Sequence, residues 1–165
     1  LANPQRQFDY DRFGGHGDLN KIEMTNVMDN FANFPALQRV IDYFGMDLVQ
    51  ARCHVQLTGQ MFTTHIDPLK KLFAGPDATD YDGNYGYDPA DIVRITIMLQ
   101  DWEPGQFFAF GNSVFQQWHA GDFIIHDWPN APHSTANASM YPRITLQLTG
   151  LRTEATDRII GKSKF

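Results

Sequence analysis

The sequence has one cysteine, a deficit of positive charge and no long apolar run. Cys53 is the single cysteine among 165 residues, so an internal disulfide is excluded and we expect a reducing compartment, the cytoplasm. The chain has 13 Lys and Arg against 19 Asp and Glu, a net charge of −6, which disfavours a nucleic-acid partner. No stretch reaches about 18 apolar residues, so we expect no membrane-spanning segment.

The composition is that of a globular protein rich in aromatic residues. Hydrophobic residues make up 42% of the chain and include 13 Phe. A length of 165 residues is enough for one domain with its own core. We therefore expect a single domain over residues 1–165, with an N-terminal flank (1–50), a core (51–151) and a tail (152–165). The sequence does not indicate an oligomeric state.

The patterning predicts an all-β core with helices outside it. Residues 92–100 alternate between apolar and polar, 51–67 are typical of strand, turn and strand, and 142–150 form a last strand. Three short strands with turns between them are predicted at 107–110, 114–118 and 122–126. Such a series favours a jelly roll, that is a double-stranded β-helix, of about eight strands. The segment 34–45 has helical spacing, with Pro35 at its start and Gly45 at its end, and 155–160 is a second short helix candidate.

One short stretch carries metal-binding chemistry. In FTTHIDP, residues 62–68, His65 and Asp67 stand two positions apart and would share one face of a strand. His133 is a candidate third ligand. Two His and one carboxylate with open positions opposite is the donor set of non-haem Fe(II) oxygen chemistry.

A second group of polar side chains would face the interior. Arg143 and Thr145 share a face of the last strand, as a carboxylate clamp requires. His54 and Gln56 share the polar face of the first core strand, and Arg94 faces inward from 92–100. We expect these three residues to contact a cosubstrate or a substrate, although an interior hydrogen-bonded His54 and an ion-paired Arg94 remain equally open readings.

The ordered set of motifs resembles the Fe(II)/2-oxoglutarate-dependent dioxygenases over residues 51–151. It is similar to prolyl-4-hydroxylase-like and aspartyl/asparaginyl β-hydroxylase-like members in three places: TGQMFTTHID (58–67), WHAGDF (118–123), and the distal His followed by Arg-x-Thr. The resemblance implies Fe(II) held by His65, Asp67 and His133, with 2-oxoglutarate anchored by Arg143 and Thr145. It also implies hydroxylation of a C–H bond in a protein side chain, an amino acid or a small metabolite, with release of succinate and CO2.

The resemblance also bears on which histidine is the distal ligand. His119 precedes the Gly-Asp turn, where the family carries no ligand. In a strand, His126 and its neighbour Asp127 would point to opposite faces. His133 is favoured because Arg143 follows it at the distance that the family shows.

The sequence departs from the family pattern at two positions. Phe62 stands where prolyl-hydroxylase-like members usually carry a Tyr whose hydroxyl helps to hold the cosubstrate. Asp67 is present, whereas many β-hydroxylase-like members lack a metal-binding Asp. The intact carboxylate also argues against a halogenase, which needs that position vacated for a halide. Two alternatives remain open: a cupin-like metal enzyme that does not use 2-oxoglutarate, and a non-catalytic jelly-roll binding module.

A long segment after the two proximal ligands is rich in turn-forming residues. Residues 69–91 contain GPD, DGN and YGY, and loops of this length are often functional lids. We expect this segment to cover the substrate and to contact it through Tyr81, Tyr85 and Tyr87.

Overall fold

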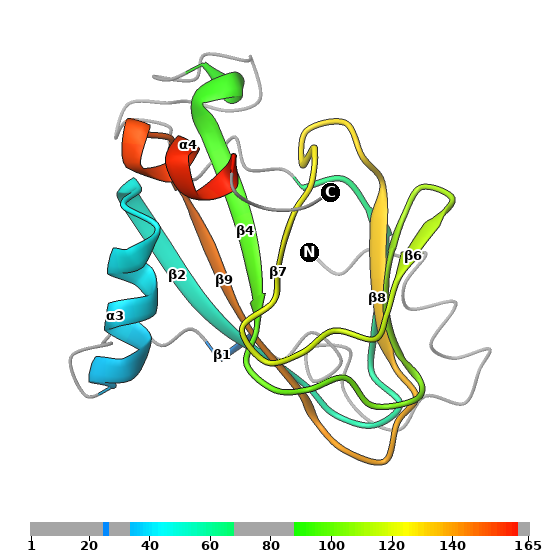
Figure 1. Ribbon diagram of the computed structural model, residues 1–165. Coiled ribbons are helices and arrows are strands. Elements are labelled where there is room, and N and C mark those ends of the chain that lie inside the picture. The colour runs from blue at the N-terminus through cyan, green and yellow to red at the C-terminus, as the bar shows by residue number, and fades with distance from the viewer. Residues whose placement is uncertain (1–24, 27–33, 68–87, 162–165) are drawn as a thin grey trace.

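The computed structural model describes residues 25–26, 34–67 and 88–161. Within these residues the strands form two antiparallel sheets that face each other (Figure 1). The larger sheet has the order β1-β2-β9-β4-β7, made by β1 (Thr25–Asn26), β2 (Asp47–Gln56), β9 (Arg143–Leu151), β4 (Ile92–Met98) and β7 (Phe123–Ile125). The smaller sheet has the order β3-β8-β5-β6, made by β3 (Met61–His65), β8 (His133–Asn137), β5 (Gln106–Phe110) and β6 (Ser113–Phe115).

The strand pairing defines a double-stranded β-helix. From β2 onward, the first strand pairs with the last, the second with the second last, and so on inward: β2 with β9, β3 with β8, β4 with β7, and β5 with β6. The chain is thus one antiparallel ribbon wound so that its strands fall into two sheets. Lateral pairing of β4 with β9 and of β5 with β8 joins successive turns of the ribbon. The predicted jelly roll of about eight strands is therefore confirmed.

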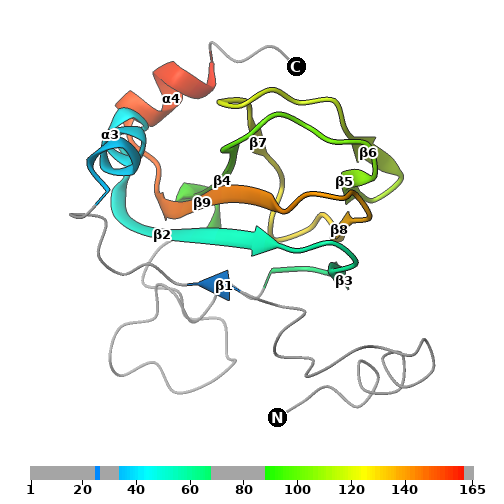
Figure 2. The same cartoon turned by 90° about the horizontal axis from the view of Figure 1, so that it is seen from below.

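The main apolar core lies on the outer face of the larger sheet, beneath two helices. Figure 2 shows α3 (Pro35–Tyr43) and α4 (Glu154–Ile160) on one side of this sheet and the smaller sheet on the other. Alternate residues of β4 and β9 face the helices, and these residues are apolar. The buried core consists of Ile41, Phe44, Met46, Cys53, Val93, Ile95, Ile97, Leu146 and Leu148.

The two predicted helices are confirmed with slightly different ends. α3 begins at Pro35, as expected for a proline in a first turn, and Gly45 after its end has a φ of 58°. α4 begins at Glu154 and is capped by Thr153, whose side chain accepts a hydrogen bond from the Thr156 backbone and donates one to the Gly45 carbonyl. Of the described helices, including the short 3-10 helix η3 (Pro89–Asp91), none is long and apolar enough to cross a membrane.

A second, smaller apolar cluster lies between the sheets. Met98, Phe108 and Trp118 are its buried members, and the rings of Phe108 and Trp118 meet edge to face at 5.7 Å. The segment 114–118, predicted as one strand, is shorter than expected. β6 ends at Phe115, and Gln117 adopts a φ of 61°, which leaves the extended conformation and accompanies the turn of Trp118 into the cluster.

The inner face of the larger sheet is polar. The side chains that alternate with the core residues point between the sheets, and the structure buries most of them. They are Arg52, His54 and Gln56 on β2, Arg94 and Thr96 on β4, and Arg143, Thr145, Gln147 and Thr149 on β9. A protein interior lined in this way needs polar partners, because unpaired polar groups are costly away from water.

The outer core should dominate stability. Leu146 is fully buried between the larger sheet and the helices, so Leu146→Ala should lower the free energy of unfolding by about 2–5 kcal/mol. Val114→Ala is the control, since Val114 is 60% exposed and should change stability by less than about 0.5 kcal/mol. Urea unfolding of both variants measures the difference, and equal effects would contradict the position of the core.

Candidate metal centre and anion site

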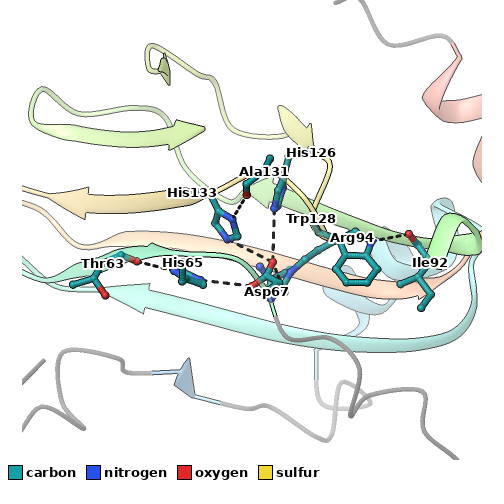
Figure 3. Close-up of polar contacts among 10 residues, drawn as sticks. Thr63, His65, Asp67, Ile92, Arg94, His126, Trp128, Ala131 and His133 are labelled. Atoms are coloured by element: carbon teal, nitrogen blue, oxygen red, sulfur yellow. Dashed lines mark hydrogen bonds and ion pairs between the residues drawn. The ribbon is translucent and has the colours of Figure 1, made fainter. Parts of the chain in front are cut away.

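The strand β3 delivers the first two candidate ligands. His65 is its last residue and Asp67 follows two positions later, with Ile66 exposed between them and Asp67 buried. The Nε2 atom of His65 lies 3.6 Å from Oδ1 of Asp67 (Figure 3). The two side chains therefore meet, as the His-x-Asp spacing indicated.

The strand β8 delivers the third candidate. His133 is its first residue and pairs with His65 across the β3–β8 ladder, so the two rings lie 4.4 Å apart. The Nε2 atom of His133 lies 3.5 Å from Oδ2 of Asp67. One ligand atom from each of the three residues lies within 4.8 Å of the other two. This is the metal cluster, and its donor set of two imidazoles and one carboxylate suits Fe(II) and related divalent metals.

Backbone carbonyls orient both imidazoles. The Nδ1 atom of His65 is 2.7 Å from the carbonyl of Thr63, and Nδ1 of His133 is 3.2 Å from the carbonyl of Ala131. With the proton on Nδ1, each neutral ring directs the lone pair of Nε2 toward the cluster (Figure 3). Metal-binding histidines are usually held in this manner by the nitrogen that does not bind.

The electrostatics keep the cluster ready for a cation. Burial raises the pKa of Asp67, but the nearby imidazoles of His126 and His65 and the charge of Arg94 hold that pKa well below its usual range. Burial also lowers the pKa of His133, partly offset by its contact with Ala131. An ionised carboxylate and a neutral imidazole are the protonation states that metal binding requires.

Arg94 contacts the metal cluster directly. It was predicted to contact a cosubstrate or a substrate, and in the structure its Nη1 atom lies 2.6 Å from Oδ2 of Asp67. Its Nη2 atom donates to the side chain of Gln147 on the neighbouring strand β9. The ion-pair reading of Arg94 thus describes the structure, and its partner is the candidate carboxylate ligand.

Arg143 is a buried guanidinium with no acidic partner in the described part of the chain. Only 3% of the residue is exposed, and burial lowers its pKa to about 9. Its Nη1 atom donates to the Phe107 carbonyl at 3.0 Å, its guanidinium carbon lies 4.1 Å from the Phe108 ring centre, and its Nε atom has no hydrogen-bond partner. Such a side chain is costly to bury unless an anion joins it.

Polar residues that could share this anion stand beside Arg143. Thr145 lies two residues along the same face of β9 and is 3% exposed. Across the β2–β9 ladder, Gln56 is paired with Arg143 and His54 with Thr145. Among the described residues, the Nε2 atom of His54 and the side-chain oxygen of Gln56 have no hydrogen-bond partner. We call Arg143, Thr145, His54 and Gln56 the anion site.

The interior carries more positive than negative charge. Asp67 is the one acidic side chain among the buried residues of the described chain, whereas both Arg94 and Arg143 are buried. Arg52 adds a third, half-buried guanidinium close enough to lower the pKa of Arg94 after the larger effect of burial. Arg94 is neutralised by Asp67, so Arg143 is left for an anionic ligand.

His126 is a neighbour of the cluster that the sequence reasoning set aside. Its side chain is 8% exposed, its Nε2 atom lies 3.7 Å from Oδ2 of Asp67, and its ring lies 4.6 Å from that of His133. The alternation of β7 could have revealed it. Phe123 and Ile125 pack on the outer core, so Ile124 and His126 must face inward. The side chain of His119, by contrast, is 84% exposed, and His119 is not part of the metal cluster.

A pocket of about 490 Å³ adjoins the metal cluster. Arg94 and His126, both in contact with Asp67, also line this pocket, together with Trp128, Asn130 and Arg152. The buried indole of Trp128 donates to the Ile92 carbonyl and so ties the turn before His133 to β4. The predicted lid residues Tyr81, Tyr85 and Tyr87 lie outside the described residues.

Comparison with known proteins finds only distant structural similarity. No protein-family model and no curated protein matches the chain. Similar solved structures include a cupin 2 conserved barrel domain protein from Salinispora arenicola CNS-205 (13% identity, TM-score 0.39, covering 70% of this chain and 72% of that one). A second is a protein with a double-stranded beta-helix domain from Klebsiella pneumoniae (14%, 0.40, 62% and 67%), and a third is a predicted oxalate decarboxylase from Thermotoga maritima (14%, 0.40, 62% and 66%).

These similarities are too low to carry an argument about activity. The class follows from the strand order and the side chains themselves: this is a double-stranded β-helix protein with a His/Asp/His candidate metal centre.

The buried state of His54 should appear in the pH dependence of stability. Burial first, and then Arg94, Arg52 and Arg143, lower the pKa of His54 from 6.5 to about 4. Between these two pH values the unfolded chain binds more protons than the folded one, so stability falls as the pH drops from 6.5 to 4.

His54→Gln should reduce this loss by up to about 3 kcal/mol, since one pKa unit corresponds to about 1.4 kcal/mol. Urea unfolding of the metal-free protein across this pH range measures the change. His119→Gln is the control, because His119 is exposed and should leave the slope as it is. A slope unaltered by His54→Gln would contradict the buried position of His54.

Proposed function

We propose that the protein is an Fe(II)- and 2-oxoglutarate-dependent dioxygenase that hydroxylates a C–H bond. The observation that carries the proposal is Arg143, a buried guanidinium without an acidic partner in the described chain, between the same two sheets as the His/Asp/His cluster. A metal cluster alone fits many reactions. A metal cluster combined with a buried carboxylate clamp fits a cosubstrate that carries a carboxylate at its far end.

His65, Asp67 and His133 would hold the iron. Their donor set leaves positions for a chelating cosubstrate and for dioxygen, as in the two-His, one-carboxylate oxygenases. Bound iron and 2-oxoglutarate would supply the oxidant, with one atom of dioxygen entering succinate as CO2 is lost and the other entering the substrate. The protein's own contribution is to place these groups and to keep them apart from bulk water.

The anion site would hold the far carboxylate of 2-oxoglutarate. Arg143 offers a planar fork, and the Thr145 hydroxyl adds a donor from the same strand face. His54 stays neutral near pH 7 because its pKa is about 4, so it can share a hydrogen bond without adding charge. The substrate, a protein side chain, an amino acid or a small metabolite, would enter through the pocket that Arg94 and His126 line.

An anaerobic titration tests the metal and the cosubstrate together. Fe(II) with 2-oxoglutarate should produce a charge-transfer absorbance in the full chain. His65→Ala and His133→Ala should abolish it, because the two remaining ligands hold iron poorly. His119→Ala is the matched control and should retain the signal, since His119 is exposed. Iron binding without a response to 2-oxoglutarate would favour a cupin-like metal enzyme. The absence of both iron binding and a response to 2-oxoglutarate would favour a binding module.

Arg143 should control cosubstrate affinity without being needed for the metal. Arg143→Ala leaves a buried carboxylate unpaired, a loss of about 2–5 kcal/mol, so 2-oxoglutarate affinity should fall about thirtyfold or more. Arg143→Lys should restore only part of it, because an ammonium lacks the fork. The exposed Arg158→Ala is the control.

Arg94→Ala separates the two arginines. Because Arg94 contacts the candidate ligand Asp67, this variant should weaken Fe(II) binding itself. If instead Arg94→Ala loses 2-oxoglutarate while Arg143→Ala retains it, the assignment of Arg143 and Thr145 to the cosubstrate is wrong.

A further inference from the structure

His126 is a buried imidazole with no described hydrogen bond. It follows β7 directly, and its side chain is turned inward and only 8% exposed. Neither of its ring nitrogens has a hydrogen-bond partner among the described residues. Leaving buried polar groups unsatisfied costs about 1–3 kcal/mol each, so a side chain retained in this state calls for a role.

Among the described residues, the carboxylate of Asp67 is the polar group that Nε2 of His126 faces. Its ring packs 5.0 Å from Phe110 and 4.6 Å from His133, and its Nε2 atom faces Oδ2 of Asp67 at 3.7 Å. Figure 3 shows this side chain reaching toward Asp67 from above, whereas His65 lies to the left of Asp67. A shift of less than an ångström would bring Nε2 and Oδ2 within hydrogen-bond distance.

The contacts of Asp67 divide between its two oxygens. Oδ1 faces Nε2 of His65 at 3.6 Å. Oδ2 receives the guanidinium of Arg94 at 2.6 Å, and the Nε2 atoms of His126 and His133 lie 3.7 Å and 3.5 Å from it. The three residues whose ligand atoms lie within 4.8 Å of one another are His65, Asp67 and His133, and His126 is not among them. His126 therefore stands beside the cluster and faces the same carboxylate oxygen as Arg94.

We propose that His126 is a positioning residue that, together with Arg94, holds Oδ2 of Asp67 and leaves Oδ1 to bind the metal. This inference rests on the proposed metal centre. A carboxylate can bind a metal through one oxygen or through both, and donors on one oxygen favour the first mode. A carboxylate restricted to one oxygen occupies one coordination position, so that the remaining positions stay available to other ligands.

The test replaces His126 in two ways in the full chain and measures Co(II) binding. His126→Phe keeps an aromatic ring against Phe110 but removes the donor, and His126→Gln keeps an N–H donor at a similar reach. We expect His126→Phe to weaken Co(II) binding about 10- to 100-fold and to alter the visible d–d spectrum, because outer-shell partners usually contribute that much to metal affinity. His126→Gln should restore most of the affinity and the spectrum.

The metal-free protein provides a readout that a purely structural role would not give. Because His126→Phe removes two unsatisfied nitrogens, the metal-free variant should unfold at a temperature no lower than the parent. A structural role predicts the opposite, a less stable protein whose metal site is otherwise unaffected. His119→Gln is the control for a change in histidine number, since His119 is exposed.

Each remaining outcome decides the proposal. Unchanged Co(II) affinity and spectrum in His126→Phe overturn it. A loss as complete as that in His65→Ala, together with one fewer coordinated imidazole in the electron paramagnetic resonance of the Cu(II)-loaded protein, makes His126 a ligand and also overturns it. If the unmodified protein does not bind Co(II), both this inference and the proposed function are overturned. If the unmodified protein and His126→Phe bind Co(II) equally well, this inference alone is overturned.

Discussion

The packing of α3 and α4 on the larger sheet is the contact on which the site depends. A small protein needs an apolar core, and here most of it lies outside the barrel, between one sheet face and two helices. Because that contact supplies most of the apolar core, the inner face of the same sheet does not need to be apolar. The alternation of β2, β4 and β9 then places their polar side chains between the two sheets.

The polar interior has two parts that differ in charge, one around Asp67 and one around Arg143. Around Asp67, opposite charges and oriented imidazoles meet, and the site is nearly complete in itself. Around Arg143, a positive charge and hydrogen-bonding groups stand without a described acidic counterpart. The first part suits a divalent cation, and the second suits an organic acid, so a ligand that joins the two would contact iron at one end and Arg143 at the other.

Periodicity predicted the strands and their faces, because a two-residue repeat follows directly from backbone geometry. It placed Ile95 outward and Arg94 inward, and the structure agrees. It did not predict the ion pair between Arg94 and Asp67. That contact joins two segments that are separate in the sequence, and a local pattern does not give the position of one relative to the other. His126 was set aside because its neighbour Asp127 points elsewhere, although the face of a strand residue depends on the residues two positions away, here Ile124.

The ligand pairing across β3 and β8 has a consequence for how such a centre can evolve. His65 and His133 face each other as partners of one ladder, so backbone hydrogen bonds set their separation. Asp67 comes after β3 has ended and depends on side-chain contacts for its position. The two imidazoles are thus the conservative part of the centre and the carboxylate is its adjustable part. Descendants of this chain could exchange the carboxylate, and with it the chemistry, while inheriting the imidazole pair intact.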